Sequence, residues 1–130
     1  MVGITTDRAA PRRARGQCGH LAGAAAEQAI ATDYERRGFP IARRRWRGAG
    51  GEIDLIARDG DGLIFVEVKK SRDFARAAER LSQRQMMRLQ LAAEEFAGSE
   101  PRGALTPMRF DVALVDGRGD IRVIENAIGI

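Results

Sequence analysis

Two runs of alternating apolar residues about a short polar turn constrain the fold of this chain more than any other feature. The runs are residues 52–58 and 63–69, and an Asp-Gly-Asp-Gly sequence at 59–62 separates them. Alternation about a Gly/Asp turn is the pattern of an antiparallel β-hairpin. If the hairpin closes symmetrically about residues 60–61, opposite residues have numbers that sum to 121.

This register gives the predicted hairpin one wholly apolar face and one face with a polar end. Asp54 lies opposite Glu67 on the polar face. Glu52 lies opposite Lys69, at the end away from the turn. A slip of one residue would bury these carboxylates, so the apolar face fixes the register. The residues of that apolar face are Ile53, Leu55, Ala57, Ile64, Val66 and Val68.

The opposed carboxylates of Asp54 and Glu67 indicate a site for a divalent cation. Like charges directly opposite each other destabilise a ribbon by roughly 0.2–1 kcal/mol, and a cation between the two oxygens removes the conflict. Mg²⁺ prefers oxygen ligands and takes one or two carboxylates with water and phosphate. Lys69 points the same way, where it could orient or deprotonate a water or offset transition-state charge. The residues alone leave an alternative open, in which Glu52 and Lys69 form an ordinary ion pair and both carboxylates are solvated.

Helix and strand signals elsewhere predict one α/β domain. In chain order, the remaining predicted elements are a helix at 20–37 stopped by Gly38, a strand at 39–47, a helix at 82–97 with a capping box, and strands at 108–115 and 121–124. The order is α-β-β-β-α-β-β, and the second helix makes a natural right-handed crossover between parallel strands. We expect a central mixed β-sheet flanked by helices, in a single domain over residues 19–130 after a disordered basic arm at 1–18.

The chain is basic, and its charge is unevenly distributed. Its 22 lysines and arginines outnumber 18 acidic residues, and residues 1–47 hold ten arginines against four acidic side chains. This asymmetry suits a polyanion partner or, equally, a solubilising arginine-rich surface. Residues 21–31 are apolar but contain Glu27, so they fit a helix better than a signal peptide, and no segment is long enough to span a membrane. We expect a cytoplasmic protein with no membrane partner.

The densest basic run surrounds Trp46. Its arginines could clamp a phosphate backbone while the indole stacks on a base. For the indole we favour the alternative, in which Trp46 belongs to the core and the arginines remain available to nucleic acid. Lys70, which follows the second apolar run, is a further candidate for nucleic-acid contact. The arginines of the run are Arg43, Arg44, Arg45 and Arg47.

The residues of the hairpin match a known pattern. An Asp, a spacer and then Glu-x-Lys on neighbouring strands resembles the PD-(D/E)xK nuclease superfamily. More narrowly, GEIDLIA at 51–57 and FVEVK at 65–69 resemble the YraN family of bacterial proteins, which is itself compared with archaeal Holliday-junction resolvases. The likeness covers about residues 20–126. The pair of segments is specific, whereas Glu-x-Lys alone would be weak.

The resemblance implies a restriction-endonuclease-like fold and a set of site residues. It makes Asp54 and Glu67 ligands of Mg²⁺ or Mn²⁺, with the carbonyl of Val68 as a further ligand. It gives Glu52 an accessory role. The residues that it implies for catalysis are Lys69, Glu67, Asp54 and, from the first helix, Glu27.

These observations together predict a metal-dependent endonuclease that acts on DNA, branched DNA included. One alternative is a nucleic-acid-binding module that keeps the fold without the chemistry, and another is a partner-binding protein with a vestigial acidic site. Analogy to resolvases, in which two strands need two sites, favours a homodimer. The chain departs from the family at Arg45, where asparagine is common, and at Gln85, where lysine is common. Both departures bear on substrate grip, since neither removes a ligand.

Overall fold

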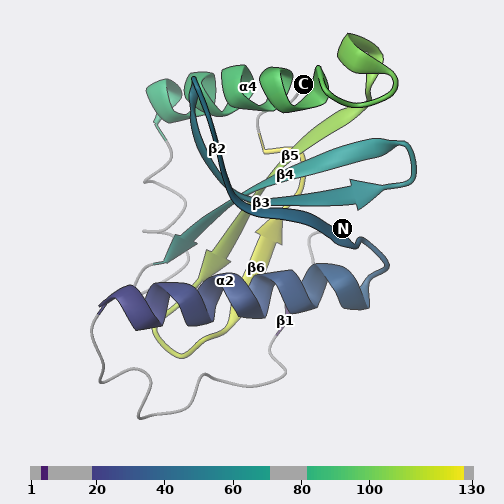
Figure 1. Cartoon of the computed structure of the whole chain (residues 1–130). Helices are drawn as coiled ribbons and strands as arrows, with labels where there is room; N and C mark the ends of the chain where they lie inside the picture. The colour runs from purple at the N-terminus through teal and green to yellow at the C-terminus, as the bar shows by residue number, and fades with distance from the viewer. Residues whose placement is uncertain (1–3, 6–18, 71–81, 128–130) are drawn as a thin grey trace.

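A β-sheet lies between two helices, so that the protein has three layers (Figure 1). The computed structural model describes residues 4–5, 19–70 and 82–127. Helix α2 covers one face of the sheet and helix α4 covers the other. In chain order, the elements of the described ranges are β1 (Ile4–Thr5), α2 (Gly19–Arg36), β2 (Ile41–Gly48), β3 (Gly51–Asp59), β4 (Gly62–Lys70), α4 (Gln83–Ala97), the 3-10 helix η1 (Gly103–Leu105), β5 (Met108–Val115) and β6 (Ile121–Ile124).

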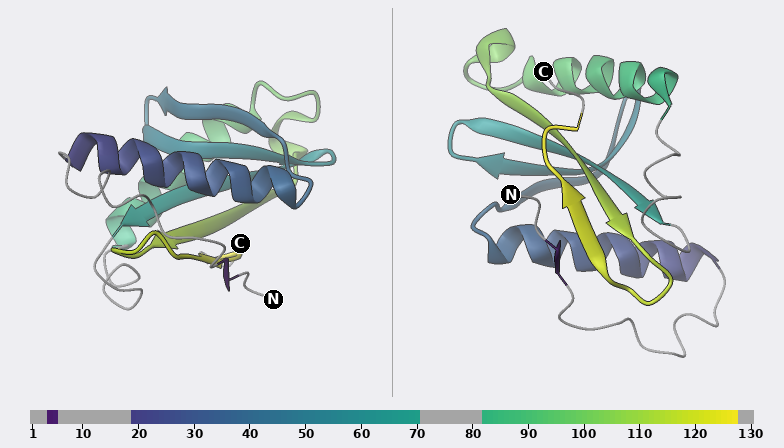
Figure 2. Two further views of the ribbon diagram at one scale, coloured as in Figure 1. Left: turned by 90° about the horizontal axis from the view of Figure 1, so that it is seen from below. Right: turned by 180° about the vertical axis from the view of Figure 1, so that it is seen from behind.

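The sheet is mixed, as the sequence predicts. Within the described residues it has six strands in the order β1-β6-β5-β4-β3-β2. β4 and β5 are parallel, with α4 in the connection between them, and the other neighbouring pairs are antiparallel. The view from behind in Figure 2 shows β5 and β6 side by side. The predicted α/β class and the order α-β-β-β-α-β-β are confirmed, with β1 and η1 in addition.

Most of the predicted basic arm lies outside the described part of the chain. Of residues 1–18, Ile4 and Thr5 form β1 and pair with β6, opposite Arg122 and Ile121 respectively. Two residues are too few for an alternating pattern, so nothing in the sequence predicts this strand. For residues 1–3 and 6–18 the expectation of disorder stays a prediction.

The central hairpin has the predicted register from its turn to Leu55 and Val66, and the ladder ends before the predicted pairs of Asp54 with Glu67 and of Glu52 with Lys69. Its pairs run from Asp59 opposite Gly62 to Leu55 opposite Val66, and the numbers of each pair sum to 121. The Asp-Gly repeat forms the turn, where Gly60 has a φ of 59°. This left-handed conformation suits glycine, which carries no Cβ to clash with the backbone. The turn therefore sets which residues of β3 and β4 share a face.

Helix α2 packs on the sheet through small and aliphatic side chains at helical spacing. Ala26, Ile30 and Tyr34 lie four residues apart and are buried. The helix stops where predicted, because Gly38 has a φ of 93° and the amide of Phe39 donates to the carbonyl of Tyr34 at 2.9 Å. The sheet residues of this core cluster are Leu55, Ala57, Ile64, Val66, Ala113, Val115, Ile121 and Val123.

Helix α4 begins with the predicted capping box. The amide of Gln85 donates to the Ser82 hydroxyl at 3.2 Å, and the amide of Ser82 donates to the Gln85 side chain at 3.1 Å. Leu89 and Phe96 are buried, and the ring of Trp46 meets that of Phe96 edge-on, with centroids 5.3 Å apart. The sheet residues of this second cluster are Ile53, Ile56, Leu63, Phe65 and Phe110. No helix in the described ranges combines the length and apolarity needed to cross a membrane.

One member of the predicted apolar face lies on the other side of the sheet. Ile53 packs under α4, whereas Leu55 packs under α2. Strict alternation along β3 would have put both on one face. The ladder between β3 and β4 ends at Leu55 and Val66, and the Val68 amide donates to the side chain of Asp54 and not to the backbone of β3. The regular pairing that would keep the alternation therefore does not extend to Ile53, and the prediction for Ile53 was wrong.

Candidate functional site

The candidate site lies where the ladder between β3 and β4 gives way to a side-chain contact. The last backbone pair toward this end joins Leu55 to Val66. One residue further, the Oδ2 atom of Asp54 accepts a hydrogen bond from the amide of Val68 at 2.8 Å. The carboxylate thus satisfies a backbone donor of the neighbouring strand, which fixes its position beside Glu67. The structure places the amide of Val68 on Asp54, and the predicted role of its carbonyl stays a prediction.

Burial and neighbouring charge act together on Asp54. The pKa of this carboxyl is raised from 3.8 to about 7, chiefly by burial and next by the charge of Glu67. Smaller increases come from Glu27 and Glu52, while the hydrogen bond from the Val68 amide lowers the pKa. The carboxylates predicted from the sequence therefore do lie close to one another. The negative charges of these neighbours therefore oppose the ionisation of Asp54 near neutral pH.

Glu67 and Lys69 form an ion pair on the same side of β4. Their Oε2 and Nζ atoms are 3.2 Å apart, and only 16% and 15% of the respective side chains are exposed. Such shielding from water makes the pair stronger than an ordinary surface salt bridge. The predicted alternative partner of Lys69, Glu52, instead lies 3.8 Å from Arg47 across the β2–β3 pair. The lysine is thereby held within reach of the Glu67 carboxylate.

Glu27 reaches the site from α2 and is held there by Arg45. The Nε atom of Arg45 donates to Oε1 of Glu27 at 2.9 Å. This hydrogen bond raises the pKa of Arg45, and Glu52 and Asp54 add smaller increases through their charge. The guanidinium therefore lies near three carboxylates. The left-handed backbone of Arg45 is uncommon for a residue with a side chain, and such conformations gather at functional sites.

The donor set suits a hard divalent cation held by two carboxylates. In the described ranges, no three His, Cys, Asp or Glu side chains converge as a ready-made metal cage. Mg²⁺ needs no such cage, because it takes one or two protein carboxylates and completes its shell with water and phosphate. Asp54 and Glu67 supply that pair, and a cation between them would relieve the repulsion that raises the pKa of Asp54. Glu27, engaged by Arg45, is not part of this pair.

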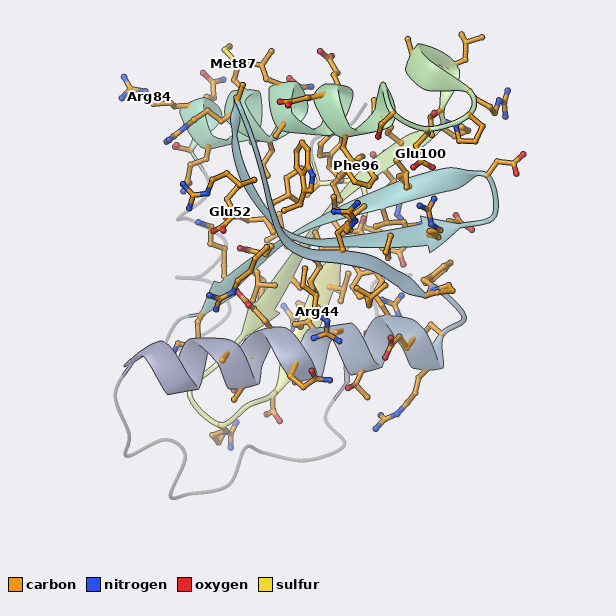
Figure 3. The ribbon with its side chains drawn as sticks, viewed as in Figure 1. Arg44, Glu52, Arg84, Met87, Phe96 and Glu100 are labelled. Carbon is orange, nitrogen blue, oxygen red and sulfur yellow. The ribbon has the colours of Figure 1, made fainter. Side chains whose placement is uncertain are left out.

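The predicted basic run does not form one patch. The guanidinium of Arg43 lies 6.0 Å from the ring of Phe96 on the α4 side, whereas Arg44 donates to Gln28 on α2 at 2.9 Å. The stick view in Figure 3 shows Arg44 pointing toward α2. Arg47 is 78% exposed and pairs only loosely with Glu52. Lys70 is exposed at the end of β4 and has a partner of its own. Neighbouring arginines on β2 thus make their contacts on different faces of the sheet.

A cleft adjoins the acidic residues on the α4 side of the sheet. Its volume is about 140 Å³. Glu52 and Glu67 line it from the hairpin, and Figure 3 shows Glu52 below the first turns of α4. The remaining lining residues are Gly51, Gln85, Arg88 and Leu89. Sequence reasoning missed Arg88, although its spacing three residues after Gln85 on a capped helix was a usable signal.

Sequence reasoning also missed a buried polar network under α2. Asp111 is 1% exposed and accepts a hydrogen bond of 2.6 Å from the hydroxyl of Tyr34. Arg109 donates to both oxygens of that carboxylate at 3.0 Å, and the amide of Asn126 adds another hydrogen bond of 3.0 Å. Burial and the charge of Asp111 raise the pKa of Tyr34. Every oxygen of the buried carboxylate is satisfied, so this network stabilises the contact between α2 and β5.

Comparison with known proteins places the chain in a family. Residues 26–115 match the model of the family described as "Uncharacterised protein family UPF0102". The chain is 66% identical over 115 residues to a UPF0102 protein of Ruegeria pomeroyi, covering 88% of this chain and 94% of that protein. It is 62% identical over 112 residues to a UPF0102 protein of Cereibacter sphaeroides (86% and 96% covered) and 50% identical over 115 residues to one of Dinoroseobacter shibae (88% and 86% covered). The chain therefore belongs to the UPF0102 family.

Proposed function

We propose that this protein is a metal-dependent endonuclease that hydrolyses DNA phosphodiesters in the cytoplasm. One observation carries the proposal: Asp54 and Glu67 lie close together at the end of the β3–β4 ladder, where burial and then the charge of Glu67 raise the pKa of Asp54 to about 7. Two neighbouring carboxylates destabilise a β-ribbon by their repulsion, and a bound cation would remove this cost. The Asp and Glu-x-Lys motif, which resembles that of the PD-(D/E)xK nucleases, supports the same function.

Each residue of the site has a role that its surroundings allow. Asp54 and Glu67 would hold Mg²⁺ or Mn²⁺, which supplies Lewis-acid activation of the phosphate and of a bound water. The Val68 amide fixes the position of the Asp54 carboxylate through its 2.8 Å hydrogen bond. Lys69, 3.2 Å from Glu67, stays close enough to orient the attacking water or to offset charge on the phosphate.

Glu27 and Arg45 would position and shield the site. Their 2.9 Å contact joins α2 to β2 beside Asp54. With a cation bound, Arg45 could turn toward a substrate phosphate, because its side chain is 48% exposed where it pairs with Glu27. We place Glu52, which contributes to the raised pKa of Asp54, as an accessory acid of the same site.

A cleavage assay tests the proposal. Purified protein is incubated with Mn²⁺ and with duplex, flap and four-way-junction DNA, and Lys69→Ala and Glu67→Gln are compared with the control Glu94→Gln on the exposed side of α4. We expect cleavage of at least one substrate by the wild type and the control, and a loss of about 100-fold or more in both site variants. If the wild type and Lys69→Ala are equally inactive on every substrate, the protein is not this nuclease.

A non-catalytic nucleic-acid-binding module is the second candidate. It is favoured by one observation, that Glu67 is neutralised by Lys69 and Glu27 by Arg45 within the protein itself. This function predicts DNA binding that falls steeply with salt and is the same with Mn²⁺ or EDTA. Metal-independent binding without cleavage would favour it, and no binding at low salt would leave the acidic residues without a nucleic-acid role.

A further inference from the structure

We infer that the cleft beside α4 is a binding site for a single nucleic-acid backbone phosphate, with Arg88 as its principal donor. The inference rests on the proposed function, because it assigns this phosphate to the nucleotide next to the one that would be cut. The cleft shares Glu67 with the candidate metal site and opens on the α4 side of the sheet. A strand whose reacting phosphate lies at Asp54 and Glu67 therefore has its neighbouring phosphate within reach of α4.

The two walls of the cleft differ in charge. Glu52 and Glu67 form the wall that belongs to the hairpin, and Gln85 and Arg88 form the wall that belongs to α4. Leu89, which is 7% exposed, contributes the apolar part of the lining. Figure 3 shows that Arg84, one turn earlier on the helix, points away from the sheet. Arg88 is thus the arginine of α4 that lines the cleft together with the acidic residues.

The charges of the cleft are not paired across it. Glu67 pairs with Lys69 at 3.2 Å, and Glu52 lies 3.8 Å from Arg47. Among the residues that the structure describes, no hydrogen bond or ion pair engages the Arg88 guanidinium. The capping box uses the side-chain oxygen of Gln85, so the NH₂ group of this residue is a further donor on the same wall. The α4 wall therefore offers hydrogen-bond donors and a positive charge that no carboxylate of the described ranges takes up.

The chemistry and size of the cleft identify its ligand. A guanidinium fork and an amide NH₂ group recognise oxyanions, and phosphate accepts two parallel hydrogen bonds from arginine. The volume of about 140 Å³ is well below the roughly 300–1,000 Å³ of pockets that enclose drug-sized ligands. One phosphate group fits this space better than a whole nucleoside does.

The acidic wall makes phosphate binding depend on metal. In the absence of a cation, Glu52 and Glu67 repel a phosphate placed opposite Arg88. A divalent cation at Asp54 and Glu67 balances the negative charge of these two carboxylates and so weakens that repulsion. The site should therefore bind metal first and the flanking phosphate second.

Binding of a short labelled single-stranded oligonucleotide tests the site. Anisotropy is measured in Ca²⁺, which occupies oxygen sites, and in EDTA, for the wild type, Arg88→Ala, Arg88→Lys and the distant control Arg102→Ala. In Ca²⁺ we expect Arg88→Ala to weaken binding about tenfold and to lower the salt slope by about 0.7, the value for one contact to a single strand. Arg88→Lys should keep the slope and recover part of the affinity, and Arg102→Ala should match the wild type. In EDTA the four proteins should bind alike.

Two further measurements separate the possible failures. Inorganic phosphate in Ca²⁺ should weaken oligonucleotide binding to the wild type more than to Arg88→Ala, and equal weakening would overturn the assignment to phosphate. The thermal shift with Mn²⁺ is recorded on the same samples. If metal stabilises both proteins but Arg88→Ala binds DNA as well as the wild type, the phosphate site is wrong and the proposed nuclease stands. If the wild type shows no metal response at all, both are overturned.

Discussion

At the scale of single residues, Asp54 joins the fold to the candidate chemistry. Its carboxylate accepts the Val68 amide where the strand ladder ends, and it lies in the field of Glu67, Glu27 and Glu52. The hydrogen bond holds the carboxylate in place, while burial and the neighbouring charges oppose its ionisation. A residue selected for stability alone would not combine these features, since an amide or hydroxyl could accept the same hydrogen bond without the charge.

The raised pKa of Asp54 predicts how stability depends on pH. The carboxyl has a pKa of about 7 in the folded protein, against 3.8 as its ordinary value. Without metal, the free energy of unfolding therefore falls as the pH rises from about 4 to 7, and this group causes no further fall at higher pH. Asp54→Asn keeps an oxygen for the Val68 amide and removes the charge. We expect its free energy of unfolding, relative to the wild type in EDTA, to increase by about 2–3 kcal/mol between pH 5 and pH 8.

Urea unfolding at the two pH values measures this change. Asp59→Asn, at the exposed end of the same strand, is the matched control and should follow the wild type at both pH values. A constant difference between Asp54→Asn and the wild type would mean that burial and the neighbouring charges do not raise the pKa of this carboxyl.

The hydroxyl of Tyr34 predicts a separate effect on stability. Tyr34→Phe removes the 2.6 Å donor to Asp111 and leaves a carboxylate that is 1% exposed with one bond fewer. We expect a loss of about 1.5–3 kcal/mol in the free energy of unfolding, because the hydroxyl donates a buried hydrogen bond to a charged carboxylate. Metal binding should be unaffected. A loss within experimental error, again by urea unfolding, would show that Arg109 and the Asn126 amide satisfy Asp111 by themselves.

At the scale of elements, the hairpin of β3 and β4 is the part that the sequence predicts best. Its turn and its alternation lie within twenty residues, so local rules suffice to set the register. The alternation fails at Ile53, beyond the end of the β3–β4 ladder at Leu55, because there the Val68 amide donates to the Asp54 side chain, and the sequence pattern does not predict where this change occurs. The contact between Tyr34 and Asp111 spans 77 residues of sequence. The closeness of the carboxylates was predictable, whereas the pairing of Arg45 with Glu27 and the place of Arg88 beside the cleft depend on how the helices pack.

Replacement by alanine should have opposite effects on stability at two glycines, Gly48 at the end of β2 and Gly23 in α2. A Cβ at Gly48 would lie 2.5 Å from the ring of Trp46, whereas a Cβ at Gly23 in α2 meets nothing within 4 Å. We expect Gly48→Ala to cost about 1–3 kcal/mol and Gly23→Ala to add about 0.5–1 kcal/mol. Trp46 is the single tryptophan, so its fluorescence reports the first change directly. Equal stability of the two variants, with unchanged emission in Gly48→Ala, would contradict the packing described here.

At the scale of the whole molecule, the three layers converge on one end of the sheet. α2 brings Glu27 to that end, the hairpin brings Asp54, Glu67 and Lys69, and α4 brings Arg88. Each chain has one pair of opposed carboxylates in its described residues. A reaction on both strands of a duplex would need two copies of that pair, so the proposed function carries with it the expectation of a homodimer when both strands are cut.

The central claim is that Asp54 and Glu67 hold a divalent cation, and thermal melting with Mn²⁺ tests it most directly. A ligand that binds the folded state stabilises it by mass action, by about 2.7 kcal/mol at a concentration 100 times its Kd. The wild type and the control Asp59→Asn should therefore melt at a higher temperature in millimolar Mn²⁺ than in EDTA at neutral pH, and Asp54→Asn should melt at the same temperature in both. An unchanged melting temperature of the wild type, or an equal rise in Asp54→Asn, would contradict the metal site.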